Sequence, residues 1–211
     1  MSWSNGEIHY HADFEVLVQN DTGQYELLEL VDPGEFCKSS DAIESSYMCI
    51  INDRTGSTPF HEHDDMRIHL EGTFRYREDA TLAAFFDTFG GQLSNERLVL
   101  PTPDGVTRLE SSGNKTLKIA VQRGVGGSRH WCVIGPGVSD ANTCRDPYNN
   151  QLATAPSEYV ISPWQSGPPL DNIMIIYDGA SAQQVLDSLK QDNTYQGFKV
   201  TPGTDGGSGG Y

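Results

Sequence analysis

The chain has 211 residues, a formal net charge of −15 at pH 7 and a hydrophobic content of 36%. Phosphate backbones and anionic membrane surfaces are bound by basic patches, so we expect neither nucleic acid nor such surfaces as partners. No segment approaches the roughly 20 apolar residues of a membrane-spanning helix, and no signal peptide is visible before Ile8. We therefore expect no membrane insertion by this chain.

The first expected strand covers residues 8–18, where apolar and polar residues alternate. In an extended strand, side chains two positions apart share a face. One face of this strand is apolar, and the other carries four polar side chains that project together: His9, His11, Asp13 and Glu15. After a turn at residues 20–23, a second strand is expected at 25–31. A loop-rich stretch to residue 59 contains a short strand candidate at 47–51.

A second histidine cluster follows at residues 60–69, with the sequence Phe-His-Glu-His-Asp-Asp-Met-Arg-Ile-His. It leads into a short strand at 67–70, whose apolar residues face inward. Its outward-facing residues are expected to be Arg67, His69 and Glu71.

The clearest helix is predicted at residues 79–89, with Asp79 as its N-cap and Gly90-Gly91 at its end. A second helix is predicted at residues 180–191. Further strands are expected at 97–100, 116–122, 130–134 and 173–177. These elements predict an α+β fold: a mainly antiparallel β-sheet with one packed helix, β-grasp-like, and a second C-terminal helix.

The domain organisation follows from the same pattern. Residues 1–200 are expected to form a single α+β domain. The six prolines between residues 135 and 172 indicate an irregular insertion. Residues 201–211 are rich in glycine and are expected to form a flexible tail.

The four cysteines fall in two local pairs, Cys37 with Cys49 and Cys132 with Cys144, each separated by twelve positions. Disulfides between these neighbours are the natural expectation, although four cysteines allow three pairings. This spacing is not that of a close Cys-x-x-Cys zinc or redox motif. Disulfides indicate an oxidising compartment, so we expect an extracytoplasmic or secreted protein.

Five of the six histidines lie in the two clusters, and each cluster contains a His-x-His pair. Imidazole is a common ligand of transition metals. If the fold brings the clusters together, they supply enough nitrogen and oxygen atoms for one zinc or copper ion. The candidate ligands are His9, His11, His61, His63, His69, Asp13 and Asp64. Asp65 follows Asp64 in the sequence. Like Asp13 and Asp64, it is expected either to orient the imidazole rings or to bind the ion directly.

The motif His9-Tyr-His11-Ala-Asp-Phe14 resembles the opening of an uncharacterised extracytoplasmic His-x-His-Ala-Asp-Phe domain family of archaea and candidate-phyla bacteria. Later motifs of that family are similar to residues 61–64, 68–71, 81–86, 117–121 and 173–178. The similarity runs in order through residues 8–190, with Ala83 at the position of a helix glycine. The resemblance implies that the two histidine clusters act together, and it implies no activity.

Three functions are consistent with this sequence, and the first is our leading hypothesis. It is a non-catalytic extracytoplasmic domain that binds a transition metal through its histidine clusters. The second is a secreted subunit that self-assembles into an oligomer, filament, tube or surface layer, with calcium as a possible bridge between carboxylates. The third is a metal-dependent hydrolase, in which Glu62 would be the general base on a metal-bound water. Under the leading hypothesis no residue is catalytic.

Overall fold

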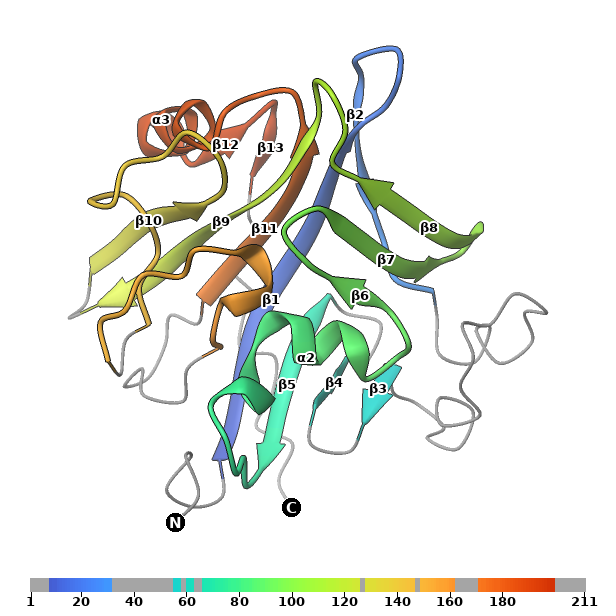
Figure 1. The fold of residues 1–211 in the computed structure, drawn as a ribbon, viewed down its shortest axis with the longest axis vertical. Coiled ribbons are helices and arrows are strands. Elements are labelled where there is room, and N and C mark those ends of the chain that lie inside the picture. The colour runs from blue at the N-terminus through green and yellow to red at the C-terminus, as the bar shows by residue number, and fades with distance from the viewer. Residues whose placement is uncertain are drawn as a thin grey trace.

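The computed structural model describes residues 8–31, 55–57, 60–62, 66–125, 128–146, 149–161 and 171–199. An eight-stranded sheet dominates these residues, with the strand order β10-β9-β11-β1-β5-β4-β3 and with β2 paired to β1 (Figure 1). Its strands are β1 (Ile8–Gln19), β2 (Tyr25–Leu28), β3 (Thr55–Ser57), β4 (Phe60–Glu62), β5 (Arg67–Gly72), β9 (Thr116–Val125), β10 (Ser128–Ile134) and β11 (Asp171–Asp178).

Two smaller sheets and two α-helices complete the described elements. One small sheet has the order β6-β7-β8, and the other is a short pair of strands. Their bounds are β6 (Gln92–Leu93), β7 (Arg97–Thr102), β8 (Gly105–Glu110), β12 (Thr194–Tyr195) and β13 (Phe198–Lys199). The helices are α2 (Leu82–Asp87) and α3 (Ala182–Asp192), with 3-10 turns η2 (Glu78–Ala80) and η3 (Pro156–Glu158). The expected α+β class with mainly antiparallel sheets is confirmed.

Strand β1 lies at the centre of the large sheet and contacts three other strands. It runs parallel to β11, with Ala12 opposite Asp171 and Val18 opposite Tyr177. On its other edge, its first half pairs antiparallel with β5 and its second half pairs antiparallel with β2. Every residue of β1 is therefore fixed in register against a neighbour.

The large sheet has a hydrophobic core on each face. On the first face, Phe14 of β1 and Phe60 of β4 each lie 5.4 Å from Phe85 of α2, measured between ring centroids. On the second face, Leu17 of β1 belongs to a separate core together with residues of α3 such as Leu186. Because side chains alternate along β1, the histidines at positions 9 and 11 share the second face with Leu17. In Figure 1, α3 lies beside β9 and β10, at the opposite end of the sheet from β4 and β5.

The structure corrects the expected N-cap of the first helix. The cap is Thr81, whose hydroxyl accepts the backbone N–H of Ala84 at 3.2 Å. Asp79 instead lies in the preceding 3-10 turn, where its carboxylate accepts the N–H of Tyr76 at 2.9 Å. The acidic side chain thus closes a local turn before the helix, and the helix begins three residues later than expected. The second helix is capped by Ser181, in a capping box with Gln184.

A buried polar cluster fixes the start of β11 beside β1. The carboxylate of Asp171 accepts the guanidinium of Arg123 at 3.3 Å and the hydroxyl of Tyr159. All three residues are buried. Burial raises the pKa of Tyr159 well above its ordinary value, so its hydroxyl stays protonated and donates to the carboxylate. This cluster joins β9, β11 and the segment after η3, part of the expected irregular insertion.

The cysteine pair Cys132–Cys144 forms a disulfide, as predicted. It joins β10 to the segment after it, where Val133 and Thr143 form a parallel bridge. The expected partner pair, Cys37 and Cys49, lies outside the described residues, as do the strand candidate at 47–51 and the tail at 201–211. Within the described ranges, no helix is long and apolar enough to cross a membrane.

Candidate metal site

The strand register aligns three histidines across three neighbouring strands. His11 of β1 is opposite His69 of β5, and His69 is in turn opposite His61 of β4. In the next row, His9 of β1 is opposite Glu71 of β5. The described histidines of the two clusters, about 50 residues apart in the chain, therefore meet on one face of the sheet, which is the condition that the metal hypothesis requires.

The atoms of this group lie at distances typical of ligands around one ion. The Nε2 atoms of His9 and His11 are 3.0 Å apart, and the Nε2 of His9 is 3.3 Å from the Oε1 of Glu71. Two nitrogens bound at about 2.0–2.1 Å in tetrahedral geometry are roughly 3.3 Å apart. Each of these two separations is close to that between two ligands of one tetrahedral ion, and the His9–His11 contact is a hydrogen bond in this structure.

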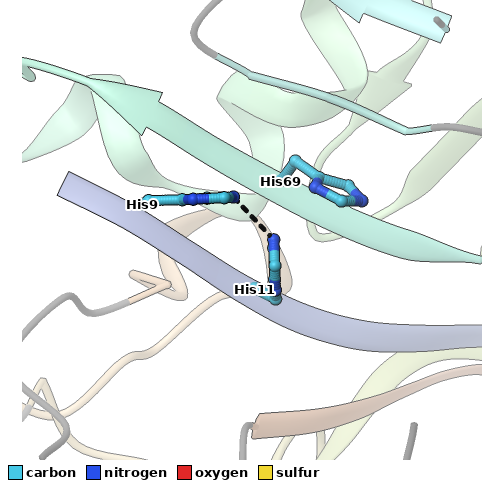
Figure 2. Close-up of side chains that lie close together, drawn as sticks. All are labelled: His9, His11 and His69. Carbon is cyan, nitrogen blue, oxygen red and sulfur yellow. Dashed lines mark hydrogen bonds between the residues drawn. The ribbon is translucent and has the colours of Figure 1, made fainter. Parts of the chain in front are cut away.

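Two overlapping groups of side chains can each hold an ion, and both include His69. The first group is His9, His11 and His69, and the second is His61, His69 and Glu71. In each group, one potential ligand atom per residue lies within 4.8 Å of the others. Figure 2 shows the first group, with His9 and His11 on β1 turned toward each other and His69 above them on β5.

The ring orientations distinguish the two groups. The rings of His9 and His11 are at 89° with centroids 4.7 Å apart, and those of His11 and His69 are at 68° and 4.4 Å. An imidazole nitrogen directs its lone pair in the plane of its ring, so steeply inclined rings can point at one ion. The rings of His61 and His69 are stacked at 9° and 5.2 Å. This nearly parallel arrangement differs from the steeply inclined rings of the first group.

Exposure changes across the site. The side chain of His9 is 45% exposed and that of Glu71 is 27% exposed. His11 and His69 are partly buried, whereas His61 is completely buried. An ion from solution therefore reaches the side of the site formed by His9 and Glu71, and His61 lies behind it.

Asp13, a predicted ligand, forms an ion pair with Arg67 and lies outside both candidate groups. Its carboxylate accepts the Nε–H of Arg67 at 2.7 Å in the next row of the same face. Neither of the two groups identified among the described residues includes Asp13. The ion pair neutralises an arginine that would otherwise repel a cation bound two residues away.

The other sequence predictions have mixed outcomes. His63, Asp64 and Asp65 lie outside the described residues. Glu71 was not predicted as a candidate ligand, although strand alternation had placed it on the same face as His69. The missing information was the register between β1 and β5, which puts Glu71 opposite His9.

Glu62, the general base of the hydrolase hypothesis, lies on β4 beside His61. Strand alternation turns it toward the face of Phe60, away from the histidine row. It is buried, and its Oε1 accepts the backbone N–H of Met66 at 2.9 Å. This position does not support a role on a water bound at the histidine face.

Comparisons with models of known protein families, with curated proteins and with solved structures found no match.

Proposed function

We propose that this chain is a non-catalytic extracytoplasmic domain that binds one transition-metal ion through His9, His11 and His69. The observation that carries this proposal is the geometry of these three side chains. Their ligand atoms lie within 4.8 Å of one another, and neighbouring rings are steeply inclined. Chance surface histidines on a strand have no reason to converge in this way.

In this proposal Glu71 becomes the fourth ligand after a side-chain movement, because its carboxylate lies 3.3 Å from the Nε2 of His9 but is grouped with His61 and His69. His61 stacks on His69 and holds that ring in place from the buried side. Three histidines and one carboxylate from two adjacent strands complete a tetrahedral site. A closed site of this kind favours a structural or storage role over catalysis.

Zinc or copper suits this donor set. Both metals accept imidazole nitrogen and carboxylate oxygen. Calcium takes six to eight oxygen ligands, whereas His9, His11 and His69 offer only nitrogen donors, and Glu71 adds one carboxylate beside His9. We therefore assign a transition metal, not calcium, to this site.

The disulfide supports the extracytoplasmic location. Cys132 and Cys144 are bonded, and such bonds persist mainly in oxidising compartments. The resemblance to the extracytoplasmic His-x-His-Ala-Asp-Phe family gives the same location.

The test is metal content measured by inductively coupled plasma mass spectrometry after reconstitution and dialysis. We expect about one zinc or copper ion per chain in the wild type and near-complete loss in His11→Ala/His69→Ala. His130→Ala is the matched control, since His130 is exposed on β10, across the sheet from the cluster. It should keep the ion.

Two results would contradict the proposal. One is a wild-type protein that holds no transition metal after reconstitution. The other is equal loss of metal in the double variant and in His130→Ala, which would indicate nonspecific binding to surface histidines. A further variant, His61→Ala, separates the two groups: it should retain the ion if His61 only supports His69.

A further inference from the structure

A lysine and an aspartate are buried together in the second core, on the face covered by α3. Lys118 lies on β9 and Asp178 ends β11, and these strands are paired antiparallel. Their side chains are 1% and 0% exposed, and the Nζ of Lys118 is 2.6 Å from the Oδ1 of Asp178. The amine and the carboxyl group are thus in contact and shielded from water.

Burying an ion pair carries a large desolvation free energy. Moving each charge out of water costs several kcal/mol, and mutual attraction often fails to offset this cost. Burial also lowers the pKa of Lys118, which brings the neutral amine closer in energy to the ammonium ion. A neutral amine is a nucleophile, so this environment favours chemistry as well as pairing.

The carboxyl group of Asp178 is surrounded by hydrogen-bond donors. Its Oδ1 accepts the backbone N–H of Ala180 at 3.0 Å. Its Oδ2 accepts the hydroxyls of Tyr25, at 3.1 Å, and of Tyr195. Burial raises the pKa of both tyrosines, so both remain protonated. Donors on both oxygens stabilise the negative charge that develops when a nucleophile attacks the carbon.

We propose that Lys118 and Asp178 condense to form an intramolecular isopeptide bond between β9 and β11. A proton first moves from the ammonium group to the carboxylate, which gives a neutral amine and a carboxylic acid. The Nζ lone pair then attacks Cγ, with the oxyanion held on Oδ1. The Cγ–Oδ2 bond breaks, and Oδ2 leaves as water after taking a second proton from nitrogen.

The atoms and charges of this reaction balance without any other reactant. One C–N bond forms, one C–O bond breaks, one water molecule is released, and nothing is oxidised or reduced. The remaining amide N–H can keep its hydrogen bond to the carbonyl of Thr116, which lies 3.0 Å from Nζ. The hydroxyls of Tyr25 and Tyr195 donate hydrogen bonds to Oδ2, which is the oxygen that departs in this reaction.

Among the described residues, the product would add a covalent link within the large sheet to the Cys132–Cys144 disulfide. It would connect residues 60 positions apart in the chain. A link that closes a long loop restricts the unfolded chain strongly, so it stabilises the fold. The inference does not depend on metal binding, because Lys118 and Asp178 lie on β9 and β11 whereas the proposed metal ligands lie on β1 and β5.

The test is mass spectrometry of the full-length protein, reduced and denatured. We expect the wild type to weigh one water molecule less than its sequence. Asp-Gly pairs, including Asp178-Gly179, can also lose water by cyclising to a succinimide, so the protein is then digested with trypsin. The isopeptide predicts one branched peptide in which residues 116–123 are joined to residues 146–190, with no cleavage at Lys118.

Two variants provide the comparison. Lys118→Arg keeps a positive charge but cannot form the amide, so the branched peptide should disappear. Lys115→Arg changes a partly exposed lysine three residues away, and the branched peptide should remain. Cleavage of the wild type at Lys118, or loss of water confined to an unbranched peptide, would overturn the proposal and leave a buried ion pair.

Discussion

Replacing Asp13 by asparagine removes the negative charge that faces Arg67 beside the proposed metal site. Asp13 lies two residues beyond His11 on β1, which corresponds to about 7 Å along an extended strand. At about 7 Å, one negative charge attracts a divalent ion by about 1 kcal/mol in water and by about 5 kcal/mol at an effective dielectric constant of about 20. The side chain of Asp13 is 13% exposed, so the actual value lies between these limits.

We therefore expect Asp13→Asn to weaken zinc binding at least about fivefold, since about 1.4 kcal/mol corresponds to a factor of ten and the lower limit is about 1 kcal/mol. The assay is a competition titration against a chromophoric zinc chelator. The matched control is Asp21→Asn, which removes the same charge from the far end of β1, where Asp21 is exposed and pairs with Lys115 at 3.2 Å. Equal affinities for the two variants would refute the argument, because net charge alone would then explain any change.

Three further predictions concern stability. Phe85→Ala should lower the free energy of unfolding by about 3–5 kcal/mol, because this fully buried ring lies at the centre of the first core; urea titration measures the change. Asp171→Asn should cost a similar amount, about 3–5 kcal/mol in the same assay, because Arg123 then stays buried without its carboxylate. Burial raises the pKa of Tyr195 above its ordinary value of 10.0. The folded state then holds the proton longer than the unfolded state, so this stabilisation is complete below pH 10 and is lost as the pH rises further. Urea titrations above pH 10 should show a shallower loss of stability in Tyr195→Phe than in the wild type.

The faces of the strands were predictable from the sequence. A side-chain period of two along β1 separates the core residue Phe14 from His9 and His11, whatever the neighbouring strands are. The same period placed His69 on an outer face of β5. Residue type and side-chain alternation within each strand therefore identified most of the candidate ligands among the described residues before the pairing of the strands was known.

The register of the sheet was not predictable in this way. Placing Glu71 opposite His9 depends on how β5 aligns with β1 across about 60 residues of chain. The parallel pairing of β1 with β11 depends on contacts still farther apart, such as the cluster of Asp171, Arg123 and Tyr159. These contacts are set by the whole fold, so the sequence pointed to the histidines but not to Glu71 as a candidate ligand or to the buried Asp171 cluster.

Three contacts, covalent or polar, join segments of this fold that are distant in sequence or are not continuously paired as β-strands. The disulfide of Cys132 holds β10 to the segment that follows it, and the Lys118–Asp178 contact joins β9 to β11. The proposed metal would join β1 to β5, beside the Arg67–Asp13 ion pair. A longer loop costs more entropy to close. Links between distant segments therefore restrict the unfolded chain, and the proposed metal would add such a link between β1 and β5, which is a structural role that needs no catalysis.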